Sequence, residues 1–281
     1  MSCLIVYLFV TLYITNRVNY IVHMKTMLKI LVPFDFTETA ENALSYVKKF
    51  VGYDEDTEIV FVYVDESEDT DAVNKLEAVK ADFESHAISK VRTLVVKGEF
   101  QSALLEVVKA EASDLVFIGT GLINKDKLIT NTSTFVLSAD CPVIVIPKGY
   151  EEFQIKKIAL VIGEDLIHNS KLLETLLIVA RRFSAKVEVL TVKRGEAEYG
   201  YTTADEKNEN VISYYLENFY SGHVFIDGPD IPKSIFKYAE DKNIDLISIL
   251  PRNHEVGETS SKGALTKVLS EMSKVPLLVI D

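Results

Sequence analysis

Apolar residues in this chain gather in short continuous runs that are separated by amphipathic segments. The first run, residues 29–33, is almost entirely apolar, which is typical of a strand in a sheet whose two faces are both covered. The residues that follow have the spacing of one helix face: Ala40, Ala43, Leu44, Val47 and Val51. Because strand and helix patterns then alternate along the chain, we predict an α/β fold with a mainly parallel sheet.

The same patterns give the bounds of the expected elements. In the first half we expect strands at 29–33, 58–64, 91–96, 115–119 and 143–146, and helices at 40–51, 71–89, 101–112 and 132–139. In the second half we expect strands near 157–162, 186–192, 223–227, 245–250 and 277–280, and helices near 168–183, 205–220, 232–242 and 263–273.

The second half repeats the landmarks of the first at a distance of about 130 residues. The segment DLVFI at 114–118 corresponds to DLISI at 245–249, and CPVIVI at 141–146 corresponds to VPLLVI at 275–280. A repeat of this length has the size of a domain rather than of a solenoid unit. We therefore predict two domains, 27–149 and 150–281, which pack against each other as an intramolecular pseudo-dimer.

Composition narrows the choice of partners and compartment. The chain of 281 residues has a formal net charge of −12, which argues against a nucleic-acid partner. Its two cysteines, Cys3 and Cys141, provide neither a disulfide framework nor metal-ligand spacing. We expect a cytoplasmic protein that binds no metal and no nucleic acid, in which Cys141 is a buried structural thiol.

Residues 1–26 form an apolar N-terminal extension that stands apart from the repeat. Its apolar run is shorter than the roughly 20 residues that a membrane-spanning helix needs, and it lacks the features of a signal peptide. We expect this extension to lie outside the working protein, with a weak membrane anchor as the alternative.

Polar residues follow two of the predicted strands in the first half. Asp35 comes after the strand at 29–33, and a Gly-Thr-Gly turn follows the strand at 115–119. In open α/β sheets, ligands bind at the carboxyl ends of the strands, and helix N-termini beside them bind anions. The candidate binding residues at these strand ends and at the following helix start are Pro33, Asp35, Gly119, Thr120, Gly121, Thr130 and Thr132.

Together these segments resemble the universal stress protein family in its tandem two-domain form. The resemblance covers 28–147 and 156–281, and it rests on the ILVP-x-DFTE, DLVFIGT and CPVIVI segments in their order and spacing. It implies two tandem flavodoxin- or Rossmann-like domains, each with a five-stranded, mainly parallel sheet flanked by helices. It also implies a role in stress responses and the ability to form dimers, with ATP binding in one branch of the family.

The ATP-binding motif of that branch is only partly present. By resemblance, Asp35 would contact adenine, Val64 would line its pocket, and Gly119 and Thr130 would hold phosphate. Ile129 stands where the motif has its last glycine, and the loop from Gly119 is three residues shorter than the motif requires. The lost residues shorten the loop by about 10 Å of reach. We therefore expect weak binding of ATP, or of a ligand with fewer phosphates such as AMP.

The second half departs further from the motif. Gly163 stands at the position of Asp35, and Leu250 ends the strand where the first half has Gly119. Gly263 occupies the last motif position, but Ala264 replaces the hydroxyl residue after it. We expect no nucleotide in this half.

Structural roles explain several candidate residues equally well. Asp35 and Glu38 have the spacing of a capping box at the start of the first helix. Gly119 and Gly121 are also typical of a simple turn after a buried strand. Thr130 and Thr132 are good residues for capping a helix N-terminus.

These observations favour a stress-response binding or interaction module that is not an enzyme. The sequence places no nucleophile beside a base and no pair of catalytic carboxylates. A slow ATP- or AMP-handling enzyme that uses the first-half site is the alternative. A third hypothesis is a structural module that pairs through the edges of its closing strands, either within one chain or between two copies in a homodimer. Any other protein partners are unknown.

Overall fold

The computed structural model describes residues 28–66, 68–121, 130–163, 166–167, 170–193, 201–250 and 263–280. The predicted N-terminal extension, 1–26, and Ile129 lie outside this part of the chain. The first half contains β1 (Leu28–Pro33), α2 (Glu38–Val51), β2 (Thr57–Asp65), α3 (Ala72–Glu84), β3 (Lys90–Lys97), α4 (Phe100–Glu111), β4 (Leu115–Thr120), α5 (Asn131–Ser138) and β5 (Val143–Pro147).

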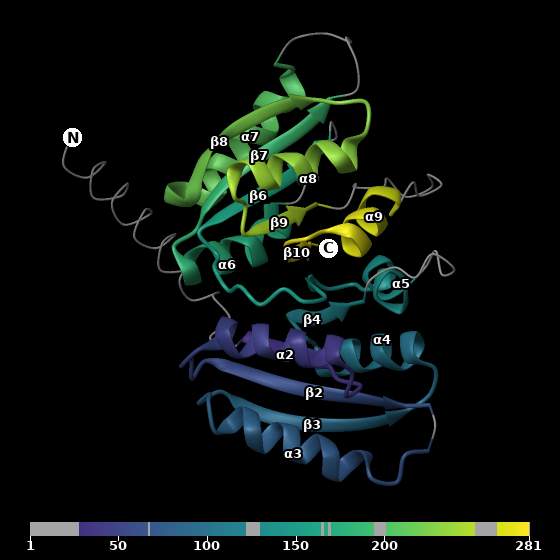
Figure 1. Ribbon diagram of the computed structural model, residues 1–281. Helices are drawn as coiled ribbons and strands as arrows, with labels where there is room; N and C mark the ends of the chain where they lie inside the picture. The colour runs from purple at the N-terminus through teal and green to yellow at the C-terminus, as the bar shows by residue number, and fades with distance from the viewer. Residues whose placement is uncertain are drawn as a thin grey trace, which may run out of the picture.

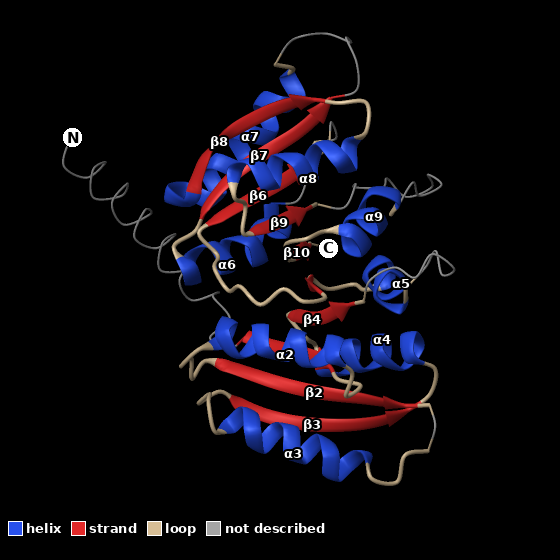
Figure 2. Ribbon diagram, viewed as in Figure 1, coloured by secondary structure: helices blue, strands red, loops and turns tan. Residues whose placement is uncertain are grey.

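The second half follows the same order of strands and helices (Figure 2). It contains β6 (Lys157–Ile162), the 3-10 helix η1 (Ser170–Leu173), α6 (Glu174–Phe183), β7 (Lys186–Lys193), α7 (Thr203–Leu216), the 3-10 helix η2 (Glu217–Phe219), β8 (Tyr220–Asp227), α8 (Ile231–Lys242), β9 (Leu246–Ile249), α9 (Ala264–Met272) and β10 (Leu277–Val279).

The strands form a single ten-stranded sheet with the order β3-β2-β1-β4-β5-β10-β9-β6-β7-β8. Pairing is parallel within each half, and the halves join where β5 pairs with β10 in the antiparallel direction. Figure 1 shows the result: the first half, from purple to teal, and the second half, from teal through green to yellow, extend one sheet in opposite directions from the middle. The inner edges of the two closing strands are therefore paired with each other.

Helices cover both faces of this sheet, which accounts for the nearly continuous apolar character of its central strands. One buried core lies between the sheet and α2, α3, α6 and α7. The other lies between the opposite face and α4, α5, α8 and α9. Each core runs through both halves, so the molecule is a three-layer α/β/α structure.

Two contacts recur at equivalent places in the halves. The Asp114 carboxylate accepts a hydrogen bond from the Lys29 backbone N–H at 2.7 Å, and the Asp245 carboxylate accepts one from that of Lys157 at 2.8 Å. The ammonium group of each of these lysines donates to a carbonyl at the end of the neighbouring helix, at 2.8 and 3.0 Å. Both contacts lie at the edge where the parallel strands begin.

The halves also touch through their helices, once on each face of the sheet. On one face, Arg182 of α6 donates to the Phe50 and Val51 carbonyls at 3.0 Å each, which places its cation at the C-terminus of α2. On the other face, α9 begins against α5: a Cβ built on Gly263 would lie 2.6 Å from Leu137. Gly263 has φ +108, a conformation that L side chains rarely adopt.

The predicted fold class is confirmed, with a few differences in the elements. The two predicted sheets are fused into one through β5 and β10. The helix expected over 71–89 ends at Glu84, and β8 begins at Tyr220, three residues before its predicted start. Cys141 is buried, as predicted. Within the described residues, none of the helices has the length and apolar character needed to cross a membrane.

Candidate functional site

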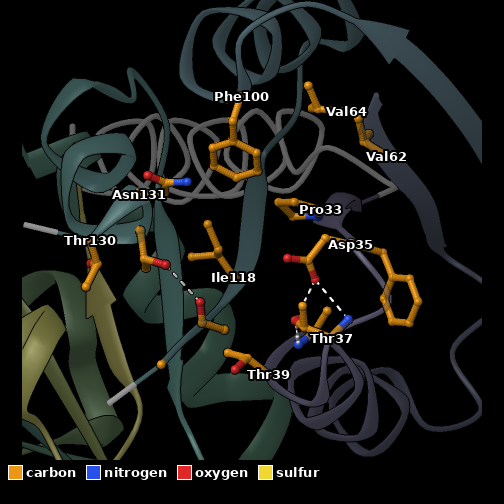
Figure 3. A pocket seen from close by; sticks show the side chains of 15 residues that line it. Pro33, Asp35, Thr37, Thr39, Val62, Val64, Phe100, Ile118, Thr130 and Asn131 are labelled. Atoms are coloured by element: carbon orange, nitrogen blue, oxygen red, sulfur yellow. Dashed lines mark hydrogen bonds between the residues drawn. The ribbon is translucent and has the colours of Figure 1, made fainter. Parts of the chain in front are cut away.

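A cavity of about 410 Å³ opens at the carboxyl ends of β1 and β4. These strands are neighbours at the centre of the first half, and the chain turns in opposite directions along the sheet from them. That is the place where open α/β sheets hold ligands. Figure 3 shows Asp35 and Thr37 on one side of the cavity, with Thr130 and Asn131 on the opposite side and Phe100 between them.

The structure brings together seven of the eight predicted site residues. These seven line the cavity: Pro33, Asp35, Val64, Gly119, Gly121, Thr130 and Thr132. The eighth, Thr120, is buried beneath the lining, where its hydroxyl lies 3.5 Å from the Gly121 carbonyl oxygen. The position of Thr120 gives it no direct contact with the cavity.

Asp35 is exposed at the mouth of the cavity and is held in place through one of its two oxygens. Its Oδ1 accepts from the Thr37 backbone N–H at 3.1 Å and from the Thr37 hydroxyl at 2.6 Å. Within the described part of the chain, Oδ2 has no hydrogen-bond partner. The carboxylate is thus oriented by Thr37 through Oδ1, which leaves Oδ2 available to accept a hydrogen bond.

The capping box predicted for Asp35 and Glu38 is wrong. The N-cap of α2 is Thr37, whose side chain accepts from the Ala40 backbone N–H at 3.3 Å. Glu38 instead forms an ion pair with Lys148 at 2.7 Å. Asp35 lies two residues before the N-cap and does not cap the helix.

Gly119 has a packing role that is independent of any ligand. A Cβ at this position would lie 2.4 Å from the Thr39 carbonyl oxygen, so the first turn of α2 can approach β4 only over a glycine. A Cβ on Gly121 would have nothing within 4 Å. The Gly-Thr-Gly segment therefore contains one glycine that the packing requires and one that borders open space.

Thr130 and Thr132 are both engaged in hydrogen bonds within the protein. Thr130 is the N-cap of α5 and forms a capping box with Ser133, whose backbone N–H donates to the Thr130 hydroxyl at 3.1 Å. Thr132 donates its hydroxyl to the Gly119 carbonyl oxygen at 2.9 Å. The capping role predicted for Thr130 is confirmed, and Thr132 ties α5 to the end of β4.

Several residues of the lining were missed by sequence reasoning. They are Phe34, Thr37, Thr39, Ala40, Val62, Phe100, Ile118 and Asn131. A signal existed for Val62, because it lies two residues before Val64 on the same strand and so on the same face. Phe100 begins α4 after a loop, and no sequence pattern indicates that it lines this cavity.

The lining combines apolar walls with little charge. Val62, Ile118 and Phe100 supply apolar surface that suits a flat, weakly polar ring. Asp35 is the one charged side chain among the described lining residues. In the described ranges no cluster of His, Cys, Asp and Glu side chains could hold a metal ion. The arrangement can accept an N–H or O–H group at Asp35 from a molecule packed against the apolar wall.

The corresponding region of the second half differs where it is described. Gly163 follows β6 at the place of Asp35, so no carboxylate occupies that position. Leu250 follows β9 at the place of Gly119 and is half-buried. Residues 251–262, which include the predicted strand-end loop, lie outside the described part of the chain.

Comparison with known proteins gives one family and several related folds. A sequence model of the universal stress protein family matches residues 27–147. A universal stress protein from Archaeoglobus fulgidus DSM 4304 shares the fold with a TM-score of 0.68 and 22% identity, over 90% of this chain and 98% of that chain. No curated protein sequence gives a significant match.

Two further solved structures extend across both halves. A putative universal stress protein from Pseudomonas aeruginosa UCBPP-PA14 has a TM-score of 0.64 and 14% identity, over 92% of this chain and 94% of that chain. The cytoplasmic domain of a prokaryotic cation chloride cotransporter has a TM-score of 0.56 and 13% identity, over 91% of this chain and 96% of that chain. At these identities the likeness concerns the fold, and the fold alone does not fix a function.

Proposed function

We propose that the chain, whose residues 27–147 match the universal stress protein family, is a stress-response binding module of that family and that its first half holds an adenine nucleotide weakly. The second half lacks the Asp35 carboxylate and serves as the structural partner of the first. The chain then works as its own pseudo-dimer in the cytoplasm, with β5 and β10 joined inside one molecule.

The observation that supports this proposal most strongly is the hydrogen bonding of the Asp35 carboxylate. Its Oδ1 is fixed by Thr37, and its Oδ2 is available at the mouth of a cavity with an apolar wall. An adenine amino group or a ribose hydroxyl is a donor of the kind that a carboxylate accepts well. The ring would pack against Val64 and Ile118, which lie in the walls of the same cavity.

The expected affinity is low because the phosphate end of the ligand would find few donors. The Thr130 and Thr132 hydroxyls are already used within the protein. Each missing charge-assisted hydrogen bond costs about 1.5–3 kcal/mol. We expect dissociation constants for adenine ligands in the range of about 0.1–1 mM.

Titration calorimetry with AMP on the full chain tests the proposal. We expect Asp35→Asn to weaken binding by about tenfold, because a neutral amide is a poorer acceptor than a carboxylate. Asp56→Asn is the matched control: it removes the same charge from an exposed residue that precedes β2, at the opposite edge of the sheet. Unchanged AMP binding in Asp35→Asn, or no binding in the unaltered protein at millimolar AMP, would overturn the assignment.

A further inference from the structure

A carboxylate from the second half reaches the helix that borders the first-half cavity. Glu271 lies near the end of α9, and its Oε1 accepts a hydrogen bond from the Ser133 hydroxyl at 2.7 Å. Ser133 is the third residue of α5, directly after Asn131 and Thr132, which line the cavity. The contact therefore joins the two halves beside the cavity wall.

The position of this carboxylate has an electrostatic consequence. The N-terminal turn of a helix carries partial positive charge from its free N–H groups and attracts anions. At α5, the Glu271 carboxylate is already bonded to a side chain of that turn. A phosphate placed beside Asn131 would lose much of the attraction of the helix and would also be repelled by the carboxylate.

The other polar groups of the cavity also disfavour a phosphate. The charged side chain in the described lining, Asp35, is negative. Thr132 donates its hydroxyl hydrogen to the Gly119 carbonyl, so that hydrogen is not available for a phosphate oxygen. The cavity can therefore hold a neutral, ring-shaped molecule with N–H or O–H donors better than it can hold a chain of phosphates.

The contact is absent from the equivalent place in the other half. Aligning Pro142 with Pro276 pairs Leu137 of α5 with Glu271 of α9. Leu137 of α5 packs against Gly263 at the start of α9, and Glu271 of α9 contacts Ser133 in the first turn of α5. The two equivalent positions therefore each contact the N-terminal end of the other helix. An apolar residue occupies the position on α5, and only on α9 is it a carboxylate. Packing of the two helices is thus possible without the charge.

We infer that Glu271 sets the ligand class of the first-half cavity by disfavouring phosphate groups, so that an uncharged adenine nucleoside binds better than a nucleoside triphosphate. This inference rests on the proposed function, because it concerns the ligand of the same cavity. It assigns the second half a direct part in the choice of ligand.

Calorimetric titration of the full chain with adenosine, AMP and ATP, without added magnesium, provides the test. In the unaltered protein we expect adenosine to bind more tightly than ATP. In Glu271→Gln, which keeps an acceptor for Ser133, ATP should bind roughly three- to tenfold more tightly and adenosine should change by less than about twofold. AMP should show an intermediate gain. Glu240→Gln is the matched control, since Glu240 is an exposed carboxylate on α8.

The outcomes separate this inference from the proposal on which it rests. If none of the three ligands binds either protein, the proposed function fails and the inference fails with it. If adenosine binds but the ratio of the adenosine and ATP dissociation constants stays the same in Glu271→Gln, the inference alone is overturned. An equal gain in Glu240→Gln would also overturn it, because the effect would then follow overall charge. The ratio is measured on one sample, so a fraction of unfolded variant does not alter it.

Discussion

The two halves of the molecule keep the same scaffold contacts but differ at the ends of their strands. Asp114 and Asp245 accept the same backbone hydrogen bond, and both contacts lie where the parallel strands begin. At the opposite edge, the first half has Asp35 where the second has Gly163. The shared contacts that hold the fold lie at the end of the sheet where the strands begin. Residues at the opposite end, where the strands finish, can therefore change without loss of the fold, and a site can be gained or lost there.

The central strands show a second difference that bears on stability. Phe117 of β4 and Ser248 of β9 lie in one row across the sheet, on either side of Ile144 and Leu278. Phe117 is fully buried against Phe50, with ring centroids 4.8 Å apart. Ser248 is also fully buried, but its hydroxyl has no hydrogen-bond partner in the described part of the chain.

Replacing Phe117 by the residue of the other half should have the largest effect. Phe117→Ser removes a buried ring and leaves a hydroxyl in an apolar core, so we expect the free energy of unfolding to fall by about 3–5 kcal/mol. Urea denaturation followed by circular dichroism measures this loss.

The matched control is made at the equivalent position of the second half. Ser248→Ala removes a buried hydroxyl that lacks a partner in the described chain, so we expect stability to stay the same or to rise by up to about 1 kcal/mol. A loss in Ser248→Ala as large as that in Phe117→Ser would contradict the proposed difference between these two positions.

A smaller effect is expected where α2 approaches β4. In Gly119→Ala, the new Cβ would meet the Thr39 carbonyl, and we expect a loss of about 1–3 kcal/mol in the free energy of unfolding. Gly121→Ala adds the same methyl group in open space and should stay within about 0.5 kcal/mol of the unaltered protein. Equal stabilities for the two variants in urea denaturation would show that packing does not require the glycine at 119.

The smallest effect concerns an ion network that is specific to the first half. Arg92 of β3 donates to Glu58 at 2.6 Å and to Glu111 at 2.5 Å. These hydrogen bonds hold the pKa of both carboxyl groups below their ordinary value of 4.5. Strand register places Lys186 in the second half where the first has Glu58, so the network has no counterpart there.

The sign of the pH dependence follows from these lowered pKa values. Because the pKa is lower in the folded state, the network stabilises the protein above about pH 4.5 and loses that contribution as the pH falls through the folded pKa values. Arg92→Met should cost about 1–2 kcal/mol at neutral pH and almost nothing near about pH 3. Urea denaturation at both pH values checks this, and a cost that does not depend on pH would contradict it.

Much of the fold could be predicted from the sequence, because the apolar runs and the repeat are strong signals. The run at 29–33 and its counterpart at 157–162 both became central strands. Pairing of the closing strands within the chain was raised as a hypothesis, but local patterns do not specify it, because it joins two edges that are distant in the sequence. The end of α3 at Glu84 was missed because residues 85–89 continue a helix-compatible pattern into a turn.

The site residues that directly follow strands could be predicted from the sequence. The hydrogen bonds of their side chains could not, because neighbouring side chains can cap the same helix. Asp35 and Gly121 follow from the rule that ligands bind at strand ends. The capping box failed because Thr37, two residues closer to the helix, offered a better-placed oxygen than Asp35. Glu271 carried no signal at all, since it comes from the far end of the chain and reaches the helix beside the cavity through a contact between helices.

The most direct test of the central claim is to identify what the protein carries when it is isolated from cells. Residues 27–281 would be purified and denatured, and the released small molecules identified by mass spectrometry, with Asp35→Ala as the comparison. We predict an adenine nucleoside or nucleotide in the unaltered protein and its loss in the variant. A protein that carries no adenine compound and shows no thermal shift with millimolar adenosine, AMP or ATP would contradict the claim that the first half is a working adenine site.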